Sequence, residues 1–368
     1  MAHQIEEYDV TFSTTGTEWH GLAKVIPAEE MKAEIEKHLF FPIIESPAIA
    51  VIEGETVPLV DEDGNGWKVI LADCRNLPVC EGREKHPPSF VPLHTPKQGY
   101  NPLENEMFFD ALERSISKLG IPFNLSTAGT LGNLAYFYFS LEIEGLKLTG
   151  GRGEELKPYL SGITSHNGVM LPRFKDSYTR PVCMNTVQGL LNEVSSVDIT
   201  GKHTENGLDS IYGMGKALEA FFTGTEKLQN EIFPAMQSRG VSPFEMREIT
   251  AGYFMLPALE SGKRLADNVK LSTQAYNATD GIVSLAKHGR GNGGETLYDL
   301  FNGATDYWSN GAGVGSEKVG IARKAYTSNF GGASVHKSNF SAYLMGSEET
   351  LSKGREIGAK VLANHMAN

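Results

Sequence analysis

A short run of basic and aromatic residues in the middle of the chain has the composition of a nucleic-acid contact. It holds three basic and two aromatic side chains: Arg173, Lys175, Arg180, Phe174 and Tyr178. Cations of this kind neutralise phosphates, and aromatic rings stack on bases. His166, in the preceding Ser-His-Asn-Gly sequence, adds a polar group. The run therefore indicates a groove for single-stranded nucleic acid, although a solvated strand face with core aromatics would have the same composition.

A second basic set consists of Lys318, Arg323 and Lys324, and it lies near two glycine-rich stretches at 289–294 and 311–315. Neither stretch continues into the Gly-Lys-Ser/Thr of a phosphate-binding loop. Neither joins a strand to a helix as in a dinucleotide-binding fold. We therefore expect these three bases to contact phosphates of a nucleic acid, and we expect no nucleotide cofactor.

Catalytic residues are harder to find in this chain. His166 and Cys183 have the types of a thiol nucleophile and its base, but no acid that would orient the histidine is identifiable. A thiol enzyme would need these two side chains to meet in a cleft. No metalloprotease, serine-hydrolase or kinase motif is present, and Cys74, Cys80 and Cys183 lack the paired spacing of zinc ligands. We predict a protein that is not an enzyme and that holds no metal or cofactor.

The charge balance limits the class of partner. The 368 residues carry a formal net charge of −12 at pH 7, and acids are concentrated near the N-terminus. An acidic chain repels polyanions unless its basic residues are clustered, so a nucleic-acid site must be local. The first ten residues lack the apolar segment of a secretory signal, and no apolar run is long enough to span a bilayer. We expect a cytoplasmic protein that does not bind membranes.

Hydrophobic periodicity predicts the elements that would position these residues. Apolar residues recur at helical spacing over 104–119, and Gly120 ends that helix. Branched and aromatic residues indicate four strands, over 123–128, 134–143, 158–166 and 179–183. Asn185 and Thr186 would cap a helix over 187–194. This order of helix, hairpin, strands and helix predicts an α+β core at residues 101–207, built on a mainly antiparallel central sheet.

Two further regions flank this predicted core. Residues 1–100 are rich in strand patterns and include a hairpin that joins 57–60 to 67–71 through an Asp-rich turn. The proline-rich stretch 87–102 indicates a linker or surface loop. Residues 208–368 have mainly helical patterns, with helices expected over 225–238, 243–251, 297–308, 338–345 and 348–366.

Several short blocks, taken together, resemble one family. They are Thr17-Glu18-Trp19-His20-Gly21-Leu22, Thr127-Ala128-Gly129-Thr130-Leu131, Ser165-His166-Asn167-Gly168, 180–186 and 296–307. In this order they are similar to blocks of the phage/plasmid-like protein family, a domain-of-unknown-function family of phages, plasmids and bacteria. The resemblance covers nearly the whole chain. In the family, the last block usually continues into an acidic residue and a histidine, whereas this chain has Trp308-Ser309-Asn310.

The resemblance implies a role in the DNA metabolism of mobile elements. The predicted order of elements is also similar to the core of single-strand annealing proteins such as RecT, Red-beta and Erf. Those proteins assemble as rings or filaments and hold single strands in a basic groove without nucleotide hydrolysis. We therefore expect a phage-type recombination or replication accessory protein that binds single-stranded DNA and promotes annealing as a homo-oligomer in the host cytoplasm. The alternative is a self-assembling structural or host-modulating protein whose partner is another protein.

Overall fold

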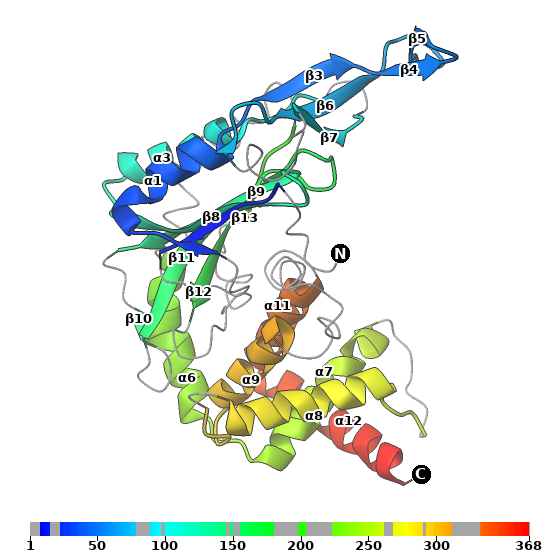
Figure 1. The fold of residues 1–368 in the computed structure, drawn as a ribbon. Helices are drawn as coiled ribbons and strands as arrows, with labels where there is room; N and C mark the ends of the chain where they lie inside the picture. The colour runs from blue at the N-terminus through cyan, green and yellow to red at the C-terminus, as the bar shows by residue number, and fades with distance from the viewer. Residues whose placement is uncertain are drawn as a thin grey trace.

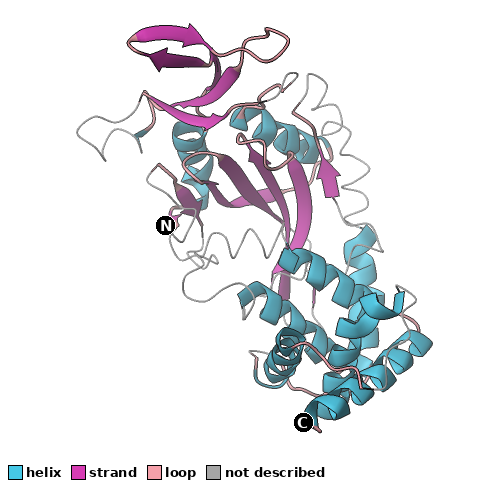
Figure 2. Cartoon of the chain, turned by 90° about the vertical axis from the view of Figure 1, so that its right-hand side faces the viewer, coloured by secondary structure: helices cyan, strands magenta, loops and turns pink. Residues whose placement is uncertain are grey.

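The chain folds into an α+β structure with strands in its N-terminal part and helices in its C-terminal part, as its pattern predicts (Figure 1). The computed structural model describes residues 8–14, 23–78, 89–96, 100–144, 148–149, 155–179, 198–203, 223–260, 268–289, 292–310 and 332–367. Figure 2 shows the sheets at one end of the molecule and most of the helices at the other. In the described residues, no helix is long and apolar enough to cross a membrane.

A large sheet forms the centre of the strand-rich part. Its strands follow the order β13-β12-β11-β9-β8-β1-β2, and β10 pairs with β11. Their bounds are β1 Thr11–Ser13, β2 Lys24–Val25, β8 Phe123–Leu131, β9 Tyr136–Ile143, β10 Leu148–Thr149, β11 Glu155–Ser165, β12 Arg173–Thr179 and β13 Asp198–Thr200. Neighbouring strands run antiparallel, except that β1 and β2 are parallel. Because β1 pairs with β8, residues on both sides of position 100 share this sheet.

The strands predicted over 123–128, 134–143 and 158–166 are confirmed as β8, β9 and β11. The strand predicted over 179–183 overlaps the described structure only at Thr179, which is the last residue of β12, and no strand was predicted over the rest of β12. Positions 180–183 and the helix predicted over 187–194 lie outside the described residues.

One face of the sheet, which we call the apolar face, is lined by Phe12, Ala128, Phe137, Phe139, Leu141, Leu160 and Phe174. Helices α1 (Ala28–Leu39) and α3 (Asn105–Lys118) lie on this side of the sheet (Figure 1). The rings of Phe108 on α3 and Phe174 on β12 stack, with centroids 4.4 Å apart and planes 22° apart. Burial of such aromatic side chains removes a large apolar area from water and holds α3 against the sheet.

Both helices follow from the spacing of their apolar residues. In α1, Met31, Ile35 and Leu39 are buried at intervals of four, and α3 buries Phe108 and Leu112 in the same way. The helix predicted over 104–119 is thus confirmed. Met107 and Leu119, which share its apolar pattern, are instead 44% and 46% exposed.

A second, smaller set of strands projects from this part of the molecule. Strands β3 (Ile43–Pro47), β6 (Lys68–Asp73) and β7 (Phe90–His94) form a three-stranded sheet, and β4 (Ile49–Ile52) pairs with β5 (Glu55–Pro58). The predicted hairpin between 57–60 and 67–71 forms only next to its turn, where the backbone N–H of Trp67 donates to the backbone oxygen of Leu59. Beyond that point the predicted partners are wrong, because β5 pairs with β4 while β6 pairs with β3 and β7. A single bridge between Val60 and Gly66 closes the predicted turn.

Strand β7 lies within the stretch 87–102, for which the proline content predicted a loop. Pro92 has no backbone N–H to donate, and it is accepted in this strand because β7 is at the edge of its sheet, in the order β3-β6-β7. An edge strand needs hydrogen bonds on one side only, so proline is a weaker argument against strand structure there than in a central position.

The C-terminal part is helical. Its elements are the π-helix η1 Leu228–Ile232, α6 Phe233–Ser238, α7 Pro243–Glu260, α8 Thr273–His288, α9 Leu297–Asn310, α11 Gly332–Leu344 and α12 Glu348–Met366. These include the predicted helices near the C-terminus, and α7 extends beyond the predicted 243–251. Helices α7 and α12 approach closely at Gly252, Gly354 and Gly358, where a Cβ atom would meet backbone or a tyrosine ring.

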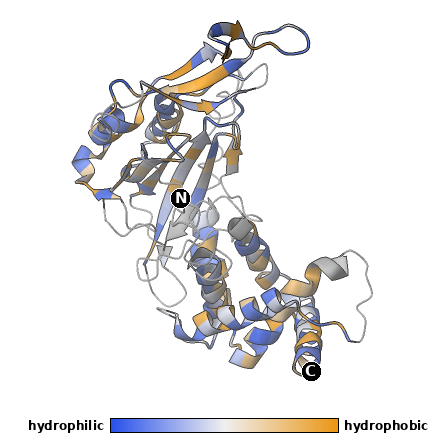
Figure 3. Ribbon diagram, turned by 45° about the vertical axis from the view of Figure 1, so that its right-hand side comes forward, coloured by the Kyte–Doolittle hydropathy of each residue, from blue (hydrophilic) through white to orange (hydrophobic). Residues whose placement is uncertain are grey.

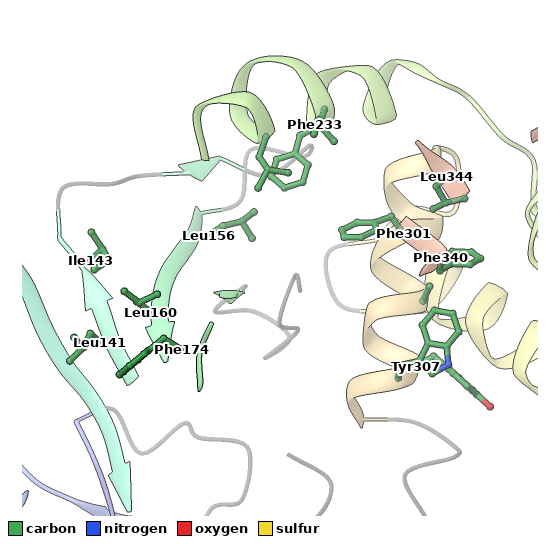
Figure 4. Packing of buried hydrophobic residues seen from close by; sticks show 14 of the residues in the cluster. Leu141, Ile143, Leu156, Leu160, Phe174, Phe233, Phe301, Tyr307, Phe340 and Leu344 are labelled. Carbon is green, nitrogen blue, oxygen red and sulfur yellow. The ribbon is translucent and has the colours of Figure 1, made fainter. Parts of the chain in front are cut away.

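One cluster of buried apolar residues continues from the sheet into the helices. Leu156 and Leu160 belong to its sheet side, and Phe301 and Phe340 to its helical side. Figure 4 shows Phe233, at the start of α6, between these two groups. The backbone N–H of Thr149 on β10 also donates to the side-chain oxygen of Gln229 on η1. The π-helix and α6 therefore connect the two parts of the fold.

Candidate nucleic-acid interface

The second face of the large sheet, opposite α1 and α3, is polar. We call it the polar face, and its residues on the two central strands are Tyr136, Tyr138, Ser140, Glu142, Lys157, Tyr159, Ser161 and Ile163. They alternate along β9 and β11 with the buried residues of the apolar face, as the two-residue period of a strand requires. Most are half-buried, whereas Tyr138 and Ile163 are 8% and 2% exposed.

Contacts between neighbouring strands order the side chains of this face. The hydroxyl oxygens of Ser140 and Ser161 lie 2.7 Å apart. The Nζ atom of Lys157 donates to Oε1 of Glu142 at 2.8 Å, and the Tyr159 hydroxyl donates to the same carboxylate at 3.4 Å. The serine pair and the group around the Glu142 carboxylate therefore follow one another along β9 and β11.

Strand β12 brings two positions of the predicted basic run, 173 and 175, to this side of the sheet. Arg173 is half-buried and lies opposite Ile163 in the ladder with β11. The backbone position of Lys175 lies opposite Ser161 on one side and opposite Asp198 of β13 on the other. Since positions 173 and 175 are two residues apart, they belong to the same side of the strand. This is the side that β11 continues with Ser161 and Ile163.

Phe174 belongs to the opposite, apolar face, so its predicted role as a base-stacking residue was wrong. Its side chain is 0% exposed, and its ring stacks on Phe108. The backbone position of Tyr178, opposite Pro158, lies on the same side of the strand as Phe174. The aromatic residues that share a face with Arg173 are Tyr136, Tyr138 and Tyr159, on the two neighbouring strands.

His166, directly after β11, is also a core residue and is not available to a ligand at the surface, contrary to its predicted role. Its side chain is 0% exposed, and its Nε2 atom lies 2.7 Å from Oδ1 of Asn105 on α3. The Asn105 amide nitrogen donates to the backbone oxygen of Leu39 at 2.7 Å, so its Oδ1 atom is the acceptor for His166. The Nε2 atom of His166 therefore carries a proton and donates to this oxygen.

Burial lowers the pKa of His166 to about 3, and the neighbouring His203 acts in the same direction. The His203 ring stacks on Tyr100, with centroids 4.9 Å apart. Burial also lowers the pKa of His203, against the opposing effect of the backbone carbonyls of Met170 and Asn101. Both imidazoles are therefore neutral residues of the interior. They pack the ends of β11 and β13 against the strand-rich N-terminal region.

The remaining predicted site residues lie outside the described part of the chain. They are Arg180, Lys318, Arg323 and Lys324, and the same holds for Cys183, the proposed partner of His166 in thiol chemistry. Among the residues that the structure describes, no group of three or more His, Cys, Asp and Glu side chains could hold a metal ion.

The sequence interpretation missed Lys157 and Ser161, although their alternation with Pro158 and Leu160 was visible in the sequence. This alternation shows that two faces differ in polarity. It does not show that the polar members of β11 lie beside Arg173, because that depends on the register between β11 and β12.

A comparison with known protein families finds a match over the part of the chain that contains most of the polar face. Residues 92–329 match the family described as Domain of unknown function (DUF932), and this stretch is more than half of the chain. The chain belongs to the DUF932 family. No curated protein and no solved structure matches the chain. The DUF932 stretch begins within β7 and includes β8 to β13 and α3, so the polar face lies in it except for the part contributed by β1 and β2.

Proposed function

We propose that this DUF932 protein binds single-stranded DNA along the polar face of its large sheet and promotes strand annealing as an oligomer. The observation that carries the proposal is the register between β11 and β12, which brings Arg173 and the position of Lys175 beside the row that holds Tyr159 and Ser161. This register supports the proposal because cations combined with aromatic rings hold single strands without reading their sequence.

The length of the face suits a short segment of a single strand. From Ser165 to Lys157 the chain advances by eight residues, which corresponds to about 26 Å along β11. Along this distance the face presents Tyr136, Arg173, Ser161, Tyr159 and Lys157 in turn. Tyr159 and Tyr136 are the residues expected to stack on bases, because both are half-buried, with part of each side chain at the surface.

The Glu142 carboxylate opposes binding of an anion at the centre of this face. Lys157 pairs with it at 2.8 Å, and this contact offsets its negative charge. The Lys157 side chain is 36% exposed, so the pair is screened by solvent and is easily rearranged. We therefore expect weak to moderate affinity with a strong dependence on ionic strength.

The annealing activity, the ring or filament assembly and the phage-type recombination role extend this proposal. They are supported by the resemblance of the sequence blocks to the phage/plasmid-like protein family and by the similarity in element order to single-strand annealing proteins. Base pairing between two strands requires exposed base edges, and contacts that use only the phosphates and the faces of the bases leave those edges free.

Fluorescence anisotropy with a labelled single-stranded oligonucleotide tests the proposal. Binding should weaken as salt rises, and Arg173→Ala combined with Lys175→Ala should reduce the slope of log affinity against log salt by about one to two. The matched control removes two exposed basic residues on the other side of the sheet, with Arg114→Ala and Lys118→Ala on α3. Absence of binding at low salt, or an equal effect of both double variants, would refute the polar face as the site.

A further inference from the structure

The projecting strands end in a feature that the proposed DNA site does not use. We call residues 49–67 the β-finger; it contains the β4–β5 hairpin and the loop that leads to Trp67. In Figure 1 this hairpin lies at the far end of the projecting strands, away from both the large sheet and the helices. Strands β4 and β5 form a sheet of two strands by themselves.

The finger exposes large apolar side chains on both of its faces. They are Ile49, Val51, Ile52, Val57, Leu59, Val60 and Trp67, with exposed fractions between 39% and 71%. Figure 3 shows hydrophobic residues along these projecting strands, at the top of the view. Neighbouring exposed apolar residues of this kind mark a surface that another molecule covers, in contrast to single exposed apolar residues scattered over a protein.

The hairpin also lacks the support that isolated strands need. Two-stranded hairpins are marginally stable in water unless one face packs on a core. Both strand edges of β4–β5 carry backbone groups that pair with no further strand in the described residues. A partner that covers Val51 and its neighbours would remove apolar surface from water and would stabilise the hairpin at the same time.

The negative charge of the β-finger restricts the class of molecule that can cover it. Between Ile49 and Trp67 there are five acidic residues and no Lys, Arg or His. Glu53 and Glu55 flank Gly54 at the hairpin tip, where Gly54 has a φ of 87°. The Asp61 carboxylate accepts hydrogen bonds from the backbone N–H groups of Asp63 and Asn65, which orders the turn of the acidic loop.

We propose that the β-finger is a docking element for a protein whose apolar groove is bordered by Lys and Arg side chains. Its apolar side chains would fill the groove, and its acids would meet the basic border. Nucleic acid is repelled by this charge, and two copies of the finger would bring like charges together. The inference is independent of the proposed DNA site, since the finger and the polar face share no residue.

Site-specific photo-cross-linking in the native cells tests this inference. The full-length protein carries a photoreactive phenylalanine in place of Val51, which is 71% exposed, and the control protein carries it in place of Phe244 on α7, which is 66% exposed. We expect a cross-linked product at position 51 that is absent at position 244. The captured protein is then identified and purified, and its affinity for the full-length chain is measured.

For that purified pair, Val51→Asp should weaken binding about tenfold or more, and Glu55→Lys should weaken it and reduce its salt dependence. Circular dichroism and the melting temperature should remain unchanged, because both residues are exposed. The inference is overturned if position 51 cross-links no more than position 244, if it cross-links only to a second copy of this chain, or if Val51→Asp binds as tightly as the wild type.

Discussion

His166 and Asn105 meet in the interior of the protein, where the Nε2 atom of the imidazole lies 2.7 Å from the Oδ1 atom of the amide. Both side chains are 0% exposed. The same amide also donates to the backbone oxygen of Leu39 at the end of α1. One asparagine therefore connects both helices of the apolar face to the end of β11, and several properties of the fold depend on this contact.

Stability should decrease as the pH falls below the ordinary pKa of histidine. The folded protein holds His166 neutral with a pKa of about 3, whereas the unfolded chain binds a proton near 6.5. The unfolded state thus gains stability between pH 6.5 and 3, at up to about 1.4 kcal/mol per pH unit from this group. Denaturant unfolding at pH 7.5 and at pH 5 measures the difference. In His166→Gln this pH-dependent loss should be smaller, and an unchanged difference would contradict the assignment.

Asn105→Leu should destabilise the protein by about 2–5 kcal/mol, because it leaves both the His166 Nε2–H and the Leu39 carbonyl without a partner in the interior. Chemical denaturation measures the loss. Asn124→Ala on β8 is the control, since its hydrogen bond to Glu144 is exposed and should contribute little. Equal losses in the two variants would show that the Asn105 contacts are not important to the fold.

Phe174→Ala should mainly lower stability and Tyr159→Ala should mainly weaken DNA binding, because these residues lie on opposite faces of the sheet. The first opens a cavity beside Phe108 and should lower stability by about 3–5 kcal/mol. The second should weaken single-stranded DNA binding by about 1–3 kcal/mol, with a smaller change in stability. Thermal unfolding and anisotropy, measured on both variants, separate the two effects. If Tyr159→Ala binds the oligonucleotide like the wild type, the proposed stacking position is incorrect.

Gly358→Ala should destabilise the helical part, although alanine favours helix formation more than glycine. A Cβ atom at this position would meet the backbone oxygen of Glu248 on α7, and backbone cannot move aside as a flexible side chain can. Overpacking of this kind typically costs about 1–3 kcal/mol, which exceeds the helix-propensity gain of about 1 kcal/mol. Gly66→Ala, at a position with open space around it, is the control. A melting temperature equal to that of the wild type would show that the two helices can separate slightly.

The order of elements could be predicted from the sequence because it depends on local patterns. The apolar spacing in α3, the aromatic run in β9 and the helices near the C-terminus each follow from residues within one turn or one strand. Their types were confirmed. Errors came where a neighbouring strand decides the outcome: Pro92 is tolerated in β7 because that strand is an edge, and β5 pairs with β4 because β6 has its own partners.

The sequence by itself therefore determined an α+β chain with a sheet that has one apolar and one polar face. Only the tertiary structure decided which residues meet on each face. Arg173 lies beside Ile163 and the tyrosine-bearing side of β11, while its sequence neighbour Phe174 lies in the core against Phe108. The reason is that alternation along a strand is a local property of the backbone, whereas register and helix packing join residues that are far apart in sequence.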